Sequence, residues 1–184
     1  MTTQAIVPRV TPRHLVVMAA GTGGHVMPGL AVARELQARG WSVSWLGTRT
    51  GMENRLVPPS GIPLDTIDFA GVRGKGLLGN LRGLVKLFSA FGACKHILRT
   101  RRADAVLGMG GYVCFPGGKI ARRLGKPLVL VNADAALLLS NKSLLADCSR
   151  IAFGFDGDDA RSSPKAVVTG NPVRAEIEAI APPA

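Results

Sequence analysis

The run LVVMAA (Leu15–Ala20), followed by GTGGHVMP (Gly21–Pro28), decides the fold. Consecutive apolar residues of this kind are typical of a strand that is buried on both faces. Glycines directly after such a strand allow a tight turn into a helix, which we expect near Gly29–Arg39. This strand–turn–helix unit predicts a parallel sheet in which strands and helices alternate along the chain.

The same alternation continues through the rest of the sequence. A long helix is predicted over Leu77–Arg101, although its three internal glycines weaken it. Buried strands are expected at Ser42–Leu46, Ile62–Phe69, Ala105–Gly108, Leu128–Val131, Arg150–Phe155 and Ala166–Thr169. The predicted fold class is therefore α/β, a Rossmann-like parallel sheet with helices on both faces.

The 184 residues suffice for one sizeable α/β domain and are few for two. We predict a disordered lead-in at 1–14, one Rossmann-like domain at 15–170, and a linker at 171–184. The linker is inferred from the proline-rich ending APPA, which follows the last strand and a short helix. An ordinary frayed terminus is the alternative.

Composition restricts the classes of partner and site. A net charge of +11 indicates an anionic partner, whether nucleic acid, an acidic membrane surface or a phosphorylated substrate. The three cysteines form no CxxC pair, which argues against a zinc site or a disulfide framework and fits a reducing compartment. No apolar run approaches the roughly 20 residues that span a bilayer, and the N-terminus has no secretory signal, so membrane contact is expected to be peripheral.

Two glycine turns are the strongest candidates for a ligand site. Gly21-Thr22-Gly23-Gly24-His25 and Gly108-Met109-Gly110-Gly111-Tyr112 each stand between a predicted strand and a helix. Free amides at a helix start suit a phosphate or diphosphate, and both turns should open at the same edge of the sheet. Val26 and Val113 replace the last glycine of a dinucleotide fingerprint, which disfavours an NAD-dependent oxidoreductase, and neither turn has the ending of a P-loop.

Two side chains of these turns are candidate functional groups. His25 follows the first turn, beside the Thr22 hydroxyl, and could act as a base or bind an anion, or else simply cap or pack the helix. Tyr112 holds the matching place on the second turn and is the only tyrosine of the chain. It could instead belong to the core.

The predicted long helix combines a wide apolar surface with positive charge. From Gly71 to Ala103 there are eight Lys or Arg residues and no acid. One apolar stripe with core-facing spacing comprises Leu84, Leu87, Phe91, Cys94 and Leu98, and a second comprises Leu77, Leu81, Val85 and Phe88. This combination favours an anionic membrane surface, although both stripes could be core. No nucleic-acid-binding motif is present, so nucleic acid is not the expected partner.

Several segments resemble one family closely, in the same order along the chain. They are GTGGHVMPGLAVARELQARGW, WLGTRTGMENRLVP, GVRGKG, VLGMGGYVCFPGG, SNK and GNPVR. The resemblance covers about Leu15 to Arg174 and is to the MurG family, the N-acetylglucosaminyltransferases of peptidoglycan synthesis. These enzymes convert undecaprenyl-diphospho-MurNAc-pentapeptide (lipid I) into lipid II.

The resemblance implies a fold, a reaction and a location. The family has a two-domain GT-B fold, inverts the anomeric centre, and needs neither a metal nor another cofactor. It acts peripherally at the cytoplasmic face of the bacterial inner membrane. Its N-terminal domain binds lipid I, and its C-terminal domain holds most of UDP-GlcNAc.

The resemblance also implies roles for individual residues. Thr22, Gly23 and Gly24 would line the donor-sugar side of the cleft, and Gly110 and Gly111 would lie near the acceptor diphosphate. His25 and Tyr112 would be catalytic residues, and Arg174 would reach the donor nucleotide. The stripe of the long helix that corresponds to the membrane-association patch comprises Leu81, Val85, Phe88 and Phe91.

The chain departs from the family in two ways. Many relatives read HEQN where this chain has Val131-Asn132-Ala133-Asp134, so Asp134 stands where an asparagine would contact the donor sugar, beside Asn132. The second departure is that no donor-binding domain follows. The first hypothesis is therefore the acceptor half of this transferase, inactive alone. The alternative is a non-catalytic fragment that binds a lipid diphosphate.

Overall fold

The computed structural model describes residues 12–69, 76–174, 177, 179 and 180, with the side chains of 76–82 left out. Seven strands form one parallel sheet in the order β3-β2-β1-β4-β5-β6-β7. They are β1 (His14–Ala19), β2 (Ser42–Thr48), β3 (Leu64–Ile67), β4 (Ala105–Gly110), β5 (Leu128–Asn132), β6 (Arg150–Phe153) and β7 (Ala166–Val168). The α/β class and the parallel sheet are confirmed.

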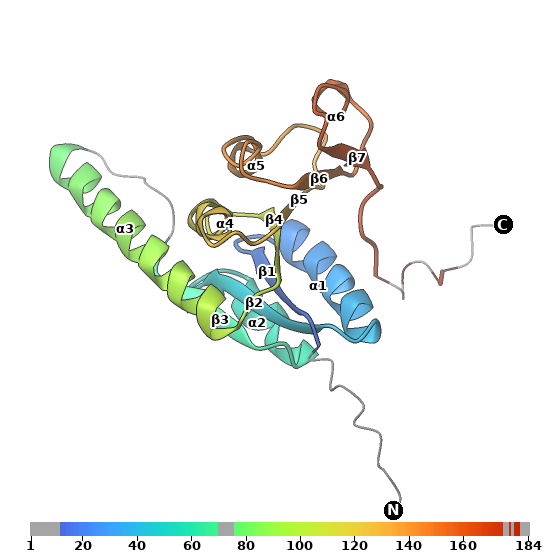
Figure 1. The fold of residues 1–184 in the computed structure, drawn as a ribbon, viewed down its shortest axis with the longest axis horizontal. Coiled ribbons are helices and arrows are strands. Elements are labelled where there is room, and N and C mark those ends of the chain that lie inside the picture. Colours follow the sequence, from blue (N-terminus) through green and yellow to red (C-terminus); the bar gives the residue numbers. More distant parts are fainter. Residues whose placement is uncertain (1–11, 70–75, 175–176, 178, 181–184) are drawn as a thin grey trace, which may run out of the picture.

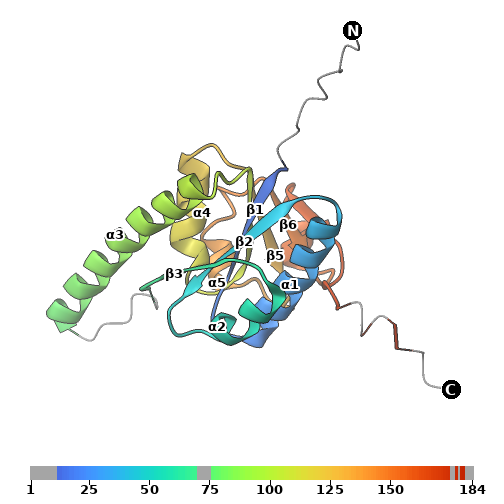
Figure 2. The same ribbon diagram turned by 90° about the horizontal axis from the view of Figure 1, so that it is seen from below.

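Helices cover both faces of the sheet (Figure 1). They are α1 (Gly23–Ala38), α2 (Glu53–Leu56), α3 (Gly76–Thr100), α4 (Cys114–Arg123), α5 (Leu139–Lys142) and α6 (Asp158–Arg161), with a short 3-10 turn at Pro58–Ser60. The two views show α3 beside α4, with one end of α3 extending beyond the sheet (Figures 1 and 2). The helix α1 lies on the opposite face from these two.

The alternation of side chains along β1 divides the core into two layers. Val16 and Met18 pack with α3 and α4, whereas Leu15, Val17 and Ala19 pack with α1. All five are almost completely buried. Burial on both faces is why this strand reads as an unbroken apolar run rather than as an alternating one.

Element boundaries agree with the sequence-based prediction to within two residues except at α1, and β3 is shorter at both ends. Helix α1 begins at Gly23, six residues earlier than Gly29, because only Gly21 and Thr22 form the turn. Strand β3 is limited to Leu64–Ile67 rather than Ile62–Phe69, and Pro63 directly precedes it. The long helix was predicted at Leu77–Arg101 and is found at Gly76–Thr100.

The order of the strands locates the expected ligand site. The chain moves outward from β1 to β2 and β3, then returns past β1 to form β4 on its other side. Sheets of this kind bind ligands in the crevice between the two strands where the direction reverses, at their carboxyl ends. That crevice lies after β1 and β4, the strands that lead into the two glycine turns.

His14 belongs to the sheet and not to a disordered lead-in. It is the first residue of β1, and its Nδ1 and Nε2 lie 2.7 Å and 2.9 Å from the hydroxyls of Ser42 and Ser44. Partial burial lowers the pKa of His14, and the positive charge of Arg101 adds to this effect. Residues 1–11 of the predicted lead-in lie outside the described residues.

The lowered pKa predicts a pH dependence of stability. The unfolded chain binds a proton at His14 more readily than the folded protein, so this histidine removes stability as the pH falls below its ordinary pKa of 6.5. We expect the free-energy advantage of the wild type over His14→Gln in urea unfolding to shrink between pH 7.5 and pH 5. A difference that stays constant or grows on acidification contradicts this.

Candidate functional site

A cleft of about 880 Å³ opens at the carboxyl ends of β1, β2 and β4. Its wall combines the ends of these strands with the start of the segment that follows β5. The lining residues are Ala20, Gly21, Thr22, His25, Thr48, Thr50, Gly51, Phe69, Leu87, Gly111, Tyr112, Phe115, Leu138, Leu139, Ser140 and Ser143. Both predicted glycine turns therefore contribute to one cleft.

The two turns touch each other directly. The Ala20 amide donates to the Gly110 carbonyl at 3.3 Å. A Cβ atom on Gly110 would lie 2.5 Å from Cδ2 of His25, and one on Gly111 would overlap the Ala20 carbonyl oxygen. Both glycines also have positive φ, 126° and 91°, which L side chains rarely adopt. Only glycine fits at these two positions without a shift of the neighbouring turn.

Cys114 joins the turns from beneath. Its one thiol proton has two possible acceptors, the carbonyls of Met18 at 3.3 Å and Gly110 at 3.2 Å, and the sulfur accepts from the Gly110 amide at 3.4 Å. Complete burial raises the pKa of Cys114 to about 12, so the thiol is neutral at physiological pH. This cysteine is consequently a packing and hydrogen-bonding residue, not a nucleophile.

The first turn presents helix-start amides and an imidazole. The amides of His25 and Val26 bond to the Thr22 carbonyl, each at 3.2 Å, whereas those of Gly23 and Gly24 have no recorded partner within the described chain. The Thr22 hydroxyl lies 3.3 Å from Nδ1 of His25, and the Nε2 side of the ring packs against Gly110. The predicted neighbourhood of Thr22 and His25 is thus found in the structure.

The second turn presents the start of α4. The first backbone hydrogen bonds of this helix start are donated by the Cys114 amide to the Gly111 carbonyl and by the Phe115 amide to the Tyr112 carbonyl. Within the described residues, the preceding amides of Gly111 and Tyr112 have no recorded partner. The Tyr112 ring is 48% exposed and lines the cleft, so it does not belong to the core.

Glu53 was not identified from the sequence, and its carboxylate holds the first turn in place through a hydrogen bond from the Gly21 amide. This carboxylate is fully buried and accepts a hydrogen bond from the Gly21 amide at 3.0 Å. It also accepts from the amide and the hydroxyl of Thr48 at 2.7 Å and 2.8 Å. In the sequence, Glu53 is marked only by its place in the matching segment WLGTRTGMENRLVP, seven residues after the predicted strand Ser42–Leu46.

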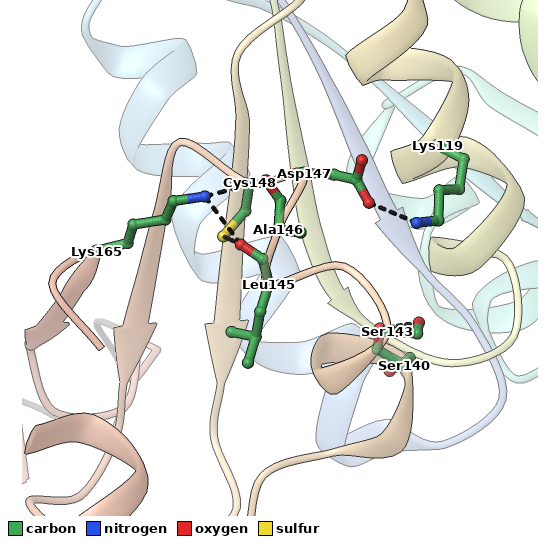
Figure 3. Close-up of polar contacts among 8 residues, drawn as sticks. All are labelled: Lys119, Ser140, Ser143, Leu145, Ala146, Asp147, Cys148 and Lys165. Carbon is green, nitrogen blue, oxygen red and sulfur yellow. Dashed lines mark hydrogen bonds and ion pairs between the residues drawn. The ribbon is translucent and has the colours of Figure 1, made fainter. Parts of the chain in front are cut away.

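A second missed contribution is the segment after β5, from Leu138 to Ser143. Two contacts anchor its far end (Figure 3): Lys165 donates to the carbonyls of Leu145 and Ala146, and Lys119 pairs with Asp147 at 2.6 Å. The Ser143 hydroxyl donates to the Ser140 carbonyl at 2.7 Å, as the same view shows. These contacts fix the chain just after the segment to α4, through Lys119, and to the residue before β7, Lys165.

Six of the eight predicted substrate-binding residues are not among the residues that line the cleft: Gly23, Gly24, Gly110, Asn132, Asp134 and Arg174. Asn132 is fully buried, and its side-chain amide bonds to the carbonyls of Asp134 and Ala136 and to the Leu138 amide. It shapes the loop after β5, so direct substrate contact is not supported. Asp134 and Arg174 are exposed and lie outside the lining set.

The lining of the cleft has a distinctive chemistry. Among its residues no Lys, Arg, Asp or Glu occurs, and His25 is the one side chain that can become a cation. Backbone amides and the hydroxyls of threonine and serine therefore supply the polar contacts. The apolar part of the lining comprises Phe69, Leu87, Phe115, Leu138 and Leu139. Such a cleft suits a ligand with polar and apolar parts.

The long helix α3 has some side chains packed against the core and others exposed. Cys94 and Leu98 are buried, and Leu87 and Phe91 pack against the core, which confirms most of the predicted core stripe. Val85 and Phe88 are 62% and 72% exposed. Phe91 contacts Phe115, with the ring centroids 6.1 Å apart, so it does not share the exposure of Phe88.

Other features of the predicted site are only partly covered by the structure. The side chain of Leu81 lies outside the described residues. Within the described ranges, no group of three His, Cys, Asp or Glu residues is placed to hold a metal ion. Likewise, no helix in that part of the chain is long and apolar enough to cross a bilayer.

Known proteins resemble this chain over most of its length. The family described as the glycosyltransferase family 28 N-terminal domain matches residues 15–153. A transferase from Methylibium petroleiphilum is 68% identical over 95% of this chain, and one from Chromobacterium violaceum is 66% identical over 94%. Both are named UDP-N-acetylglucosamine–N-acetylmuramyl-(pentapeptide) pyrophosphoryl-undecaprenol N-acetylglucosamine transferase.

The chain spans 48% of the length of each of these two relatives. A solved structure, MurG of Acinetobacter baumannii, gives the same picture. It superimposes with a TM-score of 0.76 at 42% sequence identity, over 88% of this chain and 47% of that one.

The contact between the turns predicts a large cost for Gly111→Ala. The added Cβ meets the Ala20 carbonyl and also strains a positive φ, so we expect a loss of at least about 2 kcal/mol in urea unfolding. Gly125→Ala is the matched control, because Gly125 has a φ of 66° but open space around its Cβ position. It should lose only about 1 kcal/mol. Equal losses would show that the turns are not in critical contact.

Proposed function

The chain belongs to glycosyltransferase family 28, and from this premise we propose that it is the acceptor-binding half of an inverting GT-B transferase. The reaction is transfer of N-acetylglucosamine from UDP-GlcNAc to lipid I, which gives lipid II. The relatives named for this activity are about twice as long as this chain. A donor-binding half is therefore required for turnover, and the chain alone is inactive.

The cleft between the glycine turns is the observation that carries the proposal. Its polar side includes Thr22, Gly111 and Tyr112 of the turns that lead into α1 and α4, where the positive ends of the helix dipoles favour a diphosphate. Among the described residues, the amides of Gly111 and Tyr112 have no hydrogen-bond partner. Its apolar side offers Leu87 and Phe115 to the first isoprene units of a lipid. A lipid-linked diphosphate has both of these parts.

His25 is the proposed general base. The 4-hydroxyl of the lipid-linked MurNAc attacks the anomeric carbon of UDP-GlcNAc as the bond to UDP breaks, and the hydroxyl proton passes to His25. The contact between Thr22 and Nδ1 orients the imidazole, and its Nε2 takes this proton. Tyr112 also lines the cleft, where its hydroxyl can position the acceptor.

The exposed apolar side of α3 is the proposed membrane contact. Val85 and Phe88 project from a helix that extends beyond the sheet, and basic residues of the same helix favour an anionic leaflet. Of the predicted membrane-association patch, Val85 and Phe88 are exposed, whereas Phe91 packs against the core. Val85 and Phe88, with Leu84, are the residues proposed to insert.

A non-catalytic fragment that binds a lipid diphosphate is the second candidate, favoured by the half-length match to the relatives. A transferase assay separates the two. We expect no lipid II from this chain alone, and turnover when it is fused to the second half of the Methylibium petroleiphilum relative. Lipid II formation by the chain alone would refute the need for a donor half. A folded but inactive fusion would favour the binding fragment.

In the active fusion, His25→Ala should lower kcat by about 10² to 10⁴, since general-base catalysis contributes factors of that size. The matched control is His96→Ala, because His96 is an exposed residue of α3 that does not line the cleft. It should leave kcat unchanged. If both variants turn over at the wild-type rate, His25 is not the base.

Phe88→Ser should weaken binding to vesicles that contain phosphatidylglycerol, because an exposed aromatic side chain is lost from the inserting surface. Phe155→Ser is the control, since Phe155 is 52% exposed but lies after β6, far along the chain from α3. Co-sedimentation should show weaker binding for the first variant only. If both variants lose vesicle binding equally, or if neither loses it, α3 is not the membrane contact.

A further inference from the structure

Glu53 makes the two glycine turns electrostatically different. Each turn follows a central strand and begins a helix, so the helix dipoles alone would favour an anion at either one. The Glu53 carboxylate, however, bonds directly to the first turn through the Gly21 amide at 3.0 Å. The second turn instead has the neutral Cys114 thiol beneath it, at 3.4 Å from the Gly110 amide.

The chain is built to accommodate this carboxylate. A Cβ atom on Gly47 would lie 2.6 Å from Cγ of Glu53, and one on Gly51 would overlap its carboxylate oxygens. Asn54 braces the same loop by donating to the carbonyls of Thr48 and Gly51 at 2.7 Å and 3.0 Å. Two glycines thus leave room for a fully buried acid, and a neighbouring amide holds the loop around it.

The hydrogen bonds of Glu53 suit a carboxylate and no neutral isostere. All three recorded partners are donors: the Gly21 amide, the Thr48 amide and the Thr48 hydroxyl. A carboxylate is an acceptor only, so it satisfies them all, whereas a glutamine would turn an NH₂ group toward one of them. The buried oxygens consequently hold one amide of the first turn and place negative charge beside it.

The family resemblance already implies that the acceptor diphosphate lies near Gly110 and Gly111, and we propose that Glu53 is the positioning residue that keeps its phosphate groups at this second turn. It fixes the first turn through the Gly21 amide, and its charge repels a phosphate there. The first turn, with Thr22 and His25, is left for an uncharged part of the substrates, such as a sugar. This inference rests on the proposed function, since it concerns how the same cleft divides a diphosphate-linked substrate.

The test measures backbone amide NMR shifts of the ¹⁵N-labelled chain during titration with inorganic pyrophosphate and with geranyl diphosphate. In the unaltered chain, the Gly111 and Tyr112 amides should shift strongly and those of Gly23 and Gly24 weakly. In Glu53→Gln, the Gly23 and Gly24 amides should also shift strongly. The affinity for pyrophosphate should rise roughly two- to tenfold, because a nearby negative charge is removed.

Asn54→Ala is the matched control. It loosens the same loop without removing the carboxylate, so a purely structural role for Glu53 predicts the same redistribution of shifts in both variants. The proposal predicts redistribution in Glu53→Gln alone.

Two results overturn the inference while leaving the proposed function intact. One is equal shifts at both turns in the unaltered chain, an arm that needs no variant to fold. The other is a folded Glu53→Gln variant that keeps the unaltered pattern. Absence of shifts at both turns with either ligand would instead refute the diphosphate cleft itself, and the inference with it.

Discussion

Backbone contact between two turns is the constraint on which the site depends. The Gly111 position lies against the Ala20 carbonyl, and Gly110 lies against the His25 ring, so neither turn can move without the other. The sheet brings them together because its strand order reverses between β1 and β4. Hydrogen bonds from Cys114 to Gly110 and from Gly21 to Glu53 then fix the second and the first turn. The cleft is the space that remains above these contacts.

Most of the fold could be predicted from local sequence. The run Leu15–Ala20 is apolar at every position because helices cover both of its faces, and this pattern distinguishes a central parallel strand from an amphipathic one. Boundaries were less accurate where glycine or proline marks them. Glycines 23 and 24 read as a turn, yet they start α1, since a helix's first residues need no intrahelical N–H bond.

The site was predictable where it is local and not where it depends on distant contacts. Thr22, His25 and Tyr112 belong to the turns themselves, so their place at the cleft followed from the strands before them. Glu53 is 32 residues from Gly21, and no pattern in the sequence joins the two. Asn132 shows the converse: the resemblance placed it beside a donor contact, but its side-chain amide is used by its own loop.

A crystal structure of this chain with a short-chain isoprenyl diphosphate tests the central claim most directly. The account predicts the diphosphate within hydrogen-bonding distance of the Gly111 and Tyr112 amides, with its isoprenyl chain against Leu87 and Phe115. A diphosphate bound away from the cleft between the turns would contradict it.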